Sequence, residues 1–274
     1  MIEVKDLRKS FDGVEVLKGI TTTFETGKVN LVIGQSGSGK TVFLKSLLNV
    51  YEPTSGHILF DGRDIVGMSR QEKEAVRAEI GTVFQGSALF DSMTVQDNIM
   101  FPLDMFTNLT FTEKKKRVKE VIGRVHLENA EKKFPSEISG GMQKRVAIAR
   151  AIVNNPRYLF CDEPNSGLDP FTANIIDDLI AEITEEYNTT TIINSHDMNS
   201  VMTIGEKIVY LRKGIKEWEG TKDILITSDN NYLIDFVYSS ELFKELREYL
   251  IKINKTSIDN IITTVENETD QENI

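Results

Sequence analysis

The chain alternates between short apolar segments and longer segments in which apolar residues recur at helical spacing. The short segments, which we interpret as β-strands, are Ile2–Val4, Val29–Ile33, His57–Phe60, Thr82–Phe84, Tyr158–Cys161, Thr191–Asn194 and Ile208–Leu211. Several are apolar throughout, as expected for strands that are buried on both faces of a parallel sheet. Helical patterns separate some of them, at Thr41–Asn49, Gly141–Val153 and Pro170–Glu186. This alternation predicts an α/β fold.

The stretch from about residue 91 to residue 156 has a different pattern, with little strand signal. Apolar residues with i, i+3, i+4, i+7 spacing form one helical face, made of Val118, Val121, Ile122 and Val125. We expect the hydroxyl of Thr112 to cap this helix, because it can accept from a first-turn N–H. The sequence therefore predicts a helical subdomain, over about 91–156, inserted in the α/β domain.

A domain boundary is predicted near Gly220, which divides the chain into 1–220 and a C-terminal extension over 221–274. The extension contains a second amphipathic pattern, formed by Leu242, Leu246, Leu250 and Ile253. Its last segment, Glu266–Ile274, is acidic and carries almost no apolar residues. We expect an acidic, frayed tail there.

Composition narrows the function classes. The 274 residues include 40% hydrophobic side chains, and 32 Lys and Arg against 42 Asp and Glu give a net charge of −10. This charge disfavours a nucleic-acid scaffold, because phosphate binding needs clustered cations. One cysteine, Cys161, permits neither an intrachain disulfide nor a cysteine zinc cluster. Neither a membrane span nor a signal peptide is expected.

The strongest chemical signal is the segment Gly34-Gln-Ser-Gly-Ser-Gly-Lys40-Thr41, which lies between a predicted strand and a predicted helix. It fits the phosphate-loop pattern G-x-x-x-x-G-K-[ST] in the required context. Glycines let backbone N–H groups approach phosphate oxygens, and the helix start adds its positive dipole end. Lys40 is expected to reach the β- and γ-phosphates, and Thr41 to hold Mg²⁺.

Two acids end another predicted strand, in Tyr158-Leu-Phe-Cys-Asp162-Glu163. Because the carboxyl ends of parallel strands meet at one edge of the sheet, these acids are expected beside the phosphate loop. We expect Asp162 to fix Mg²⁺ through water and Glu163 to act as general base on the attacking water. His196 follows a third strand and is expected to contact the γ-phosphate and order that water.

A second anion-binding helix start is predicted at Ser139-Gly140-Gly141-Met142-Gln143. Ser139 is a suitable N-cap, and the two glycines leave the first N–H groups open to an anion. A chain with one phosphate loop and a second such helix start fits an arrangement in which two chains each supply one part of a nucleotide site.

With these segments, residues 1–220 resemble the ATP-binding cassette (ABC) transporter ATPases, and their motifs follow in the family's order. Gly34–Thr41 resembles Walker A, Gln85 the Q-loop, Ser139–Gln143 the LSGGQ signature, and Tyr158–Glu163 Walker B. Ser166–Asp169 resembles the D-loop and His196 the H-loop. Met142 stands where the family usually has Gln, and Phe11 replaces the commoner Tyr that stacks on adenine; neither change indicates an inactive ATPase.

The resemblance implies a RecA-like P-loop core with an inserted helical subdomain and a C-terminal helical extension. It implies ATP and Mg²⁺ as ligands, with Gln85, Glu163 and His196 as catalytic residues and Thr41 and Gln85 at the metal. The implied nucleotide-binding residues are Phe11, Gly34, Ser36, Gly37, Ser38, Gly39, Lys40, Thr41, Val42, Ser139, Gly140, Gly141, Asp162 and Asp169. Two cassettes are expected to close head to tail around two ATP molecules and to drive a membrane permease, so that the chain contacts the membrane indirectly, at the cytoplasmic face of the inner membrane.

The segment Gln85–Asn98, followed by Phe101-Pro102-Leu103, resembles the ATPases of Mce-associated phospholipid transporters, as does the Gly-Met-Gln signature variant. This favours an ATPase that powers phospholipid transport between bacterial membranes, with a permease and an Mce-domain lipid-binding protein as partners. The extension resembles that group's tail, which packs on the partner cassette. Two alternatives stay open: the ATPase of a small-molecule importer, for example of amino acids, and a nucleotide-gated mechanical switch on a cell-division or lipoprotein-release partner.

Overall fold

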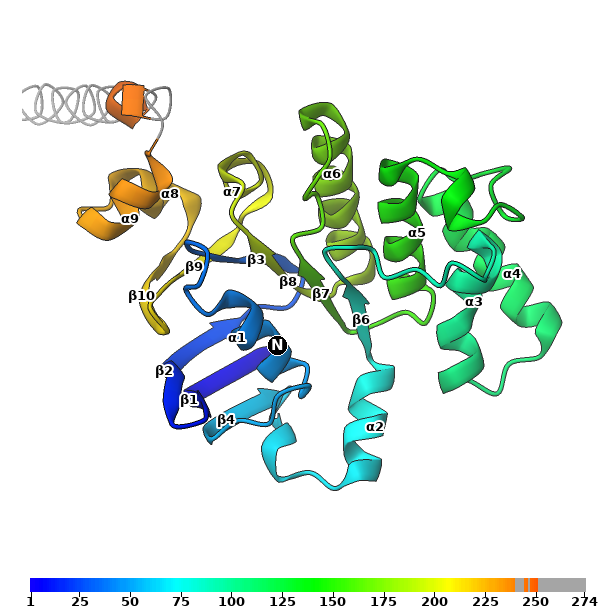
Figure 1. Ribbon diagram of the computed structural model, residues 1–274, viewed down its shortest axis with the longest axis horizontal. Coiled ribbons are helices and arrows are strands. Elements are labelled where there is room, and N and C mark those ends of the chain that lie inside the picture. Colours follow the sequence, from blue (N-terminus) through cyan, green and yellow to red (C-terminus); the bar gives the residue numbers. More distant parts are fainter. Residues whose placement is uncertain (240–243, 246, 251–274) are drawn as a thin grey trace, which may run out of the picture. The chain divides into compact units, whose positions relative to one another are not determined.

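A six-stranded sheet forms the centre of the first part of the chain in this computed structural model, which describes residues 1–239, 244–245 and 247–250. Its strand order is β10-β9-β3-β8-β7-β6 (Figure 1). The strands are β3 (Lys28–Ile33), β6 (Ile80–Val83), β7 (Tyr158–Asp162), β8 (Thr190–Ser195), β9 (Lys207–Arg212) and β10 (Ile215–Gly220). The register from β6 to β9 is parallel throughout. The predicted α/β class is confirmed.

A second, four-stranded sheet was not predicted. It has the order β2-β1-β4-β5, with β1 (Ile2–Phe11), β2 (Val14–Phe24), β4 (Ser55–Phe60) and β5 (Arg63–Asp64), and its pairings are antiparallel. The predicted strands Ile2–Val4 and His57–Phe60 belong to this sheet. Strand β2 escaped prediction because it is buried on one face only, and its polar threonines and lysine interrupt the apolar pattern.

Helix α1 (Lys40–Leu47) lies between the two sheets (Figure 1). Its apolar residues Phe43, Leu44 and Leu47 belong to one core cluster with side chains of both sheets, such as Leu7 of β1 and Val32 of β3. Each of these five side chains is at most 2% exposed. Helix α1 is thereby fixed on both sides, which holds its first turn at the carboxyl edge of the six-stranded sheet.

The opposite face of the six-stranded sheet is covered by α6 (Pro170–Tyr187) and α7 (Met198–Ile204) (Figure 1). Between β6 and β7 the chain forms α3 (Val95–Phe106), α4 (Phe111–Arg124) and α5 (Gly140–Ile152), which pack on one another. This helical region matches the predicted insert. A further helix, α2 (Arg70–Ala78), precedes β6.

The predicted N-cap of α4 is wrong by two positions. Thr110, and not Thr112, is the N-cap of α4, and its hydroxyl accepts from the Glu113 N–H while Glu113 accepts from the Thr110 N–H at 2.7 Å. Both threonines lie before the apolar pattern, so the pattern could not separate them. The acidic residue three positions after Thr110 completes a capping box, and that is the signal which distinguishes the two.

The chain divides into one compact unit over Met1–Glu219 and a second over Gly220–Ile274. In the second unit, the described part contains α8 (Lys222–Thr227) and α9 (Asn231–Val237), and Arg247 donates to the Ser228 carbonyl at 2.8 Å. The predicted acidic tail and half of the predicted Leu242–Ile253 helix, including Leu242, Leu246 and Ile253 of its apolar pattern, lie outside the described residues. No helix within the described ranges is both long and apolar enough to cross a membrane.

Candidate active site

The phosphate loop connects β3 to α1. Gly39 is the N-cap of α1 with φ 106°, and no side chain caps the helix, so its first N–H groups remain available to an anion. Gly34 is required by close approach, because a Cβ there would lie 2.3 Å from the Leu211 carbonyl oxygen. Ser36 and Gly37 are exposed at the tip of the loop. The loop thus presents backbone donors in a shape that permits no side chain at its base.

Lys40 and Ser38 carry the polar groups inside this loop. The Lys40 ammonium donates to the carbonyl oxygens of Gly34 at 2.7 Å and Gln35 at 3.2 Å, and the residue is 7% exposed. Burial lowers the pKa of Lys40, an effect that the charges of Glu163 and Asp162 oppose. The buried Ser38 hydroxyl has no hydrogen-bond partner in the described structure. A buried hydroxyl without a partner is unfavourable, and a phosphate oxygen would provide one.

The two acids at the end of β7 have different surroundings. Asp162 accepts from the Asn194 side chain at 3.0 Å, which ties it to the neighbouring strand β8. Glu163 follows with a left-handed φ of 48°, and its N–H donates to the Asn194 carbonyl at 3.0 Å. This turn directs the two adjacent carboxylates to different partners.

Glu163 is the point where three segments meet. Gln85, which follows β6, donates from Nε2 to one Glu163 oxygen at 2.9 Å, and also approaches the Ser166 hydroxyl at 3.4 Å. His196, which follows β8, places Nδ1 3.0 Å from the other Glu163 oxygen. The Glu163 side chain is 20% exposed and that of His196 60%. At the carboxyl edge of the sheet, Glu163 therefore contacts both of the other predicted catalytic residues.

The remaining predicted positions flank this centre. Asp169 is the N-cap of α6 and accepts from the Thr172 hydroxyl at 2.6 Å, and these bonds lower its pKa. Ser139 is the N-cap of α5 and accepts from the Met142 N–H at 3.3 Å. Gly141 lies close to the start of α6, since a Cβ there would lie 2.7 Å from Thr172. The starts of α5 and α6 are thus adjacent.

Three further positions have simpler environments. Phe11 is 37% exposed and forms an edge-to-face pair with Tyr51, with ring centroids 5.2 Å apart. Thr41 is exposed in the first turn of α1, and Val42 beside it is half-buried. Gly140 begins α5 and is exposed. Phe11 therefore offers an accessible aromatic surface, and Thr41 an accessible hydroxyl.

The residues present fit a nucleoside triphosphate with Mg²⁺. The partnerless Ser38 hydroxyl and the uncapped start of α1 both suit phosphate oxygens. In the part of the chain that is described, no group of three or more His, Cys, Asp or Glu could hold a metal ion. Mg²⁺ is typically bound by one or two protein oxygens together with phosphates. Thr41, Gln85 and Asp162 could supply such oxygens.

A buried polar network beside the site was not predicted. Asn165 donates to the Ser200 hydroxyl at 2.8 Å, and Ser200 donates to Asp177 at 2.6 Å. Asp177, on α6, is 3% exposed, and burial raises its pKa to about 6. The network connects the segment after Glu163 with the helix after His196. No local pattern marks it, because its members come from three separate elements.

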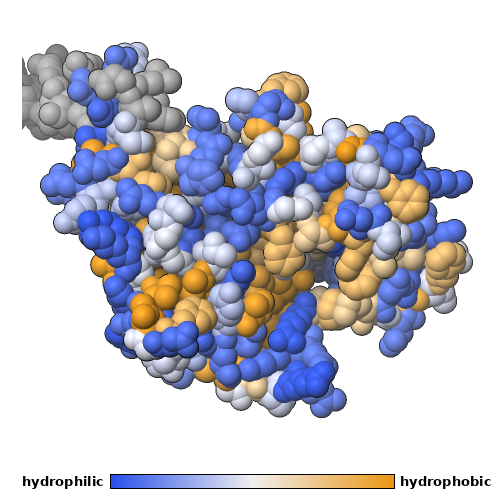
Figure 2. Space-filling model, viewed as in Figure 1, coloured by the Kyte–Doolittle hydropathy of each residue, from blue (hydrophilic) through white to orange (hydrophobic). Residues whose placement is uncertain are grey.

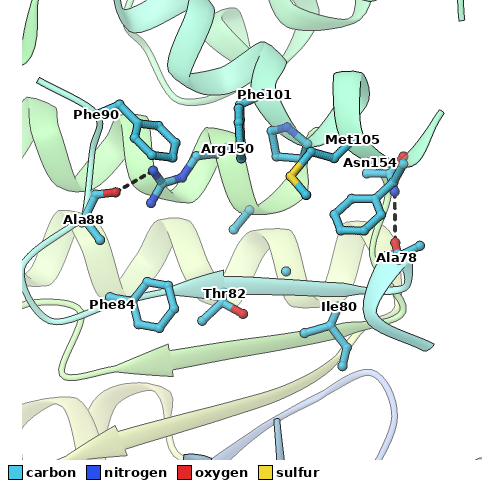
Figure 3. A pocket seen from close by; sticks show the side chains of 14 residues that line it. Ala78, Ile80, Thr82, Phe84, Ala88, Phe90, Phe101, Met105, Arg150 and Asn154 are labelled. Atoms are coloured by element: carbon cyan, nitrogen blue, oxygen red, sulfur yellow. Dashed lines mark hydrogen bonds between the residues drawn. The ribbon is translucent and has the colours of Figure 1, made fainter. Parts of the chain in front are cut away.

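An apolar groove between β6 and α3 was also not predicted. It encloses about 260 Å³ and is lined by Phe84, Phe90, Phe101, Met105 and Phe106, together with the polar groups of Arg150 and Asn154 (Figure 3). Apolar side chains gather on this face of the molecule in the space-filling view (Figure 2). Phe84 directly precedes Gln85, so the groove borders the segment that contacts Glu163.

Comparison with known proteins agrees with this geometry. The ABC transporter family model matches residues 17–166. A Mycobacterium leprae protein named "Probable ribonucleotide transport ATP-binding protein mkl" is 40% identical over 86% of this chain and 68% of its own length. Its Mycobacterium bovis counterpart is 39% identical, and this chain spans 66% of its length. The methionine import ATP-binding protein MetN of Corynebacterium diphtheriae is 36% identical over 87% of this chain and 72% of its own length.

Solved structures extend the similarity to the fold. The dimeric post-hydrolysis state of the ATP-binding cassette MJ0796, bound to ADP and Pi, has a TM-score of 0.74 and 31% identity over 81% of this chain and 98% of that one. The cassette cbiO1 of Clostridium perfringens, part of the ABC transporter complex cbiONQ, has a TM-score of 0.77 and 30% identity over 85% and 94%. The P-loop core of this chain is therefore the RecA-like core of those cassettes, and the chain belongs to the ABC transporter family.

Proposed function

We propose that this chain binds and hydrolyses ATP as the nucleotide-binding subunit of an ABC transporter. The observation that carries this proposal is the contact of Glu163 with both Gln85 and His196, at the sheet edge where the phosphate loop ends. In that position the Glu163 carboxylate can accept a proton from a water molecule. Lys40 and the start of α1 would stabilise the phosphate charge. Mg²⁺, when bound, would neutralise charge on the phosphates.

The site also requires a second chain. Ser139 and Gly140 open the N-terminus of α5, an anion-binding feature in the same chain as the phosphate loop. The solved MJ0796 cassette, which resembles this chain, is described as dimeric. We infer a homodimer in which the α5 start of one protomer completes the phosphate-loop site of its partner. The C-terminal unit beyond Gly220 is proposed to strengthen that dimer.

The groove between β6 and α3 is proposed to receive a helix of the permease. Its aromatic lining is partly exposed, with Phe84 at 44% and Met105 at 60%. An exposed apolar groove of this kind suits an amphipathic helix laid into it. Peripheral attachment at the cytoplasmic face of the inner membrane follows from this arrangement, because the permease would hold the chain there.

The proposed substrate is phospholipid, moved between bacterial membranes with an Mce-domain lipid-binding protein as a further partner. This proposal rests on the Gln85–Asn98 segment, on Phe101-Pro102-Leu103 and on the Gly-Met-Gln signature, which resemble the Mce-associated ATPases. Methionine import is a second candidate, because MetN proteins are 36–38% identical to this chain over 78–87% of its length.

Two variants test the ATPase. Glu163→Gln removes the base and retains the fold, so ATP binding should persist while turnover is lost. Lys40→Ala removes a phosphate contact and should abolish binding of ATP, measured by equilibrium titration with a labelled nucleotide. Hydrolysis by purified Glu163→Gln at the parent's rate would show that the base is assigned wrongly.

The partners are tested by purifying the chain in mild detergent from the membranes in which it is native, with mass spectrometry of the retained proteins and lipids. A permease, an Mce-domain protein and phospholipid would support the lipid proposal. A solute permease with a substrate-binding lipoprotein would favour the import candidate. A cell-division or lipoprotein-release membrane protein without lipid would instead indicate the mechanical switch.

A further inference from the structure

Two buried cations of α5 point to a feature of the fold that goes beyond its nucleotide site. Lys144 is 5% exposed and Arg150 is 9% exposed. Burial lowers the pKa of both groups, because a low-dielectric environment disfavours the charged form. A buried cation is unfavourable unless its N–H groups are hydrogen-bonded. The bonds made by these two residues therefore identify what they stabilise.

Both cations donate to the backbone of one short loop. The Lys144 ammonium donates to the Gln85 carbonyl, and Arg150 donates to the Ser87 and Ala88 carbonyls at 2.7 Å each. The contact of Arg150 with Ala88 is drawn in Figure 3. Cation-assisted bonds of this kind are stronger than neutral ones. Two side chains of α5 thus hold the backbone of residues 85–88 through three carbonyl groups.

The loop itself has a backbone that needs such support. Ser87 and Ala88 both adopt left-handed conformations, with φ of 61° and 46°. Non-glycine residues are unfavourable in this region and stay there only where the surroundings determine the backbone. Their carbonyl oxygens are the ones that Arg150 binds. The cations and the strained backbone therefore form one unit.

The loop 85–88 and its two cations connect Glu163, the apolar groove and the start of α5. The Gln85 side chain contacts Glu163 at 2.9 Å, and Ala88 lines the apolar groove. The helix that holds the loop begins at Gly140, directly after the Ser139 cap. A displacement of the groove would therefore be transmitted through the loop both to Glu163 and to the start of α5.

We propose that Lys144 and Arg150 form a clamp on the loop 85–88, which makes the groove, Gln85 and the start of α5 move together. Both are positioning residues, since they act through the loop backbone. The consequence for turnover rests on the proposed function, in which the groove receives a permease helix and Glu163 acts during ATP hydrolysis. The clamp itself is a property of the fold and can be tested without nucleotide.

The first test is amide hydrogen exchange of the full chain without nucleotide, comparing the parent with Lys144→Met. The substitution keeps the length of the side chain and removes its donor. We expect exchange in peptides that span residues 84–90 to rise by about tenfold, as for a loop that opens locally more often. Unchanged protection of these peptides would overturn the clamp.

Arg145→Met is the matched control. Arg145 lies on the same helix and donates to the His126 carbonyl at 2.8 Å and the Val125 carbonyl at 3.3 Å, so it fixes a different loop with the same chemistry. Its substitution should raise exchange around residue 126 and leave residues 84–90 as protected as in the parent. Equal loosening of residues 84–90 in both variants would indicate general destabilisation and overturn the specific role.

A double-mutant cycle tests the link to the site. We expect Lys144→Met to lower kcat about tenfold in the parent but less than about twofold in a Gln85→Ala background, because non-additivity identifies residues that act as a unit. KM for ATP should stay unchanged. An equal loss in both backgrounds would overturn the positioning role. A parent that binds but never hydrolyses ATP would contradict the proposed function, while hydrogen exchange would still decide on the clamp.

Discussion

Nδ1 of His196 lies 3.0 Å from Oε1 of Glu163. The two residues follow neighbouring strands, since Asp162 of β7 pairs with Asn194 of β8, and a backbone bond from Glu163 to the Asn194 carbonyl fixes their spacing. Gln85 occupies the other Glu163 oxygen at 2.9 Å. The Glu163 carboxylate is therefore held in one orientation by a hydrogen-bonding partner at each oxygen. The proposed role of Glu163 as general base requires such an orientation.

Removal of the histidine should lower turnover and leave binding intact. We expect His196→Ala to reduce kcat by about 10²-fold, in the range typical for an oriented acid–base group. KM for ATP should change little, because the phosphate loop is untouched. Steady-state ATPase kinetics of the purified chain measure both constants.

His57→Ala is the control for that variant. His57 also contacts a carboxylate, with Nδ1 2.6 Å from Asp64, and its side chain is 62% exposed against 60% for His196. It lies on β4 of the antiparallel sheet, outside the candidate site. Its substitution should leave kcat unchanged. A similar loss in both variants would contradict a specific role of His196.

Two glycines of the phosphate loop should respond differently to a methyl group. A Cβ at Gly34 would lie 2.3 Å from a carbonyl oxygen of β9 and 2.7 Å from the Ser38 hydroxyl, whereas a Cβ at Gly37 meets nothing within 4 Å. Gly34→Ala should therefore cost more than about 3 kcal/mol, and Gly37→Ala, with its φ of 76°, about 1 kcal/mol. Urea denaturation without nucleotide distinguishes them, and equal losses would contradict the steric argument.

Much of the candidate site could be predicted because its residues follow apolar strands. Strand ends in a parallel sheet meet at one edge, so the positions of Glu163 and His196 in the sequence were enough to place them together. The phosphate loop could be predicted as well, since the spacing of its glycine and lysine residues reflects local backbone geometry. The order of the strands in the sequence was thus sufficient to predict the site residues that lie at strand ends.

The parts that escaped prediction depend on contacts between distant segments. The clamp joins Lys144 to a carbonyl 59 residues away, and a backbone acceptor leaves no mark on residue type. An aspartate on a helix is typically exposed, yet Asp177 is buried and accepts hydrogen bonds from Asn165 and Ser200. The antiparallel sheet escaped for another reason, because β2 presents polar residues on its second face.

The stability of the chain should respond to pH through Asp177. Burial raises its pKa to about 6 from an ordinary 3.8, with help from the charge of Asp197 and against the donors of Ser200 and Asn165. Between these two values the folded state binds a proton that the unfolded state lacks. This contribution to stability is complete below pH 3.8 and is lost as the pH rises through 6.

Comparison with Asp177→Asn isolates this effect, because asparagine does not titrate. The free energy of unfolding of the parent, relative to that variant, should rise by about 2–3 kcal/mol from pH 7 to pH 4. Urea denaturation at several pH values measures it. Asp178→Asn, at the exposed neighbouring position, keeps the Asp177 carboxyl, so its free energy of unfolding relative to Asp177→Asn should still rise from pH 7 to pH 4. A flat difference for Asp177→Asn would contradict the raised pKa.

The groove can be tested by a charge on its rim. Met105 is 60% exposed and lines the groove, so Met105→Glu should be tolerated by the fold while placing a carboxylate among Phe101, Phe106 and Phe90. An apolar helix face would then have to desolvate that charge on docking. We expect a loss of the co-purified permease of about tenfold or more, with unchanged ATPase activity of the isolated chain.

Phe111→Glu is the matched control, because Phe111 is 63% exposed at the start of α4 and lies outside the groove lining. Retention of the permease by Met105→Glu, or equal loss with Phe111→Glu, would place the docking surface elsewhere on the chain.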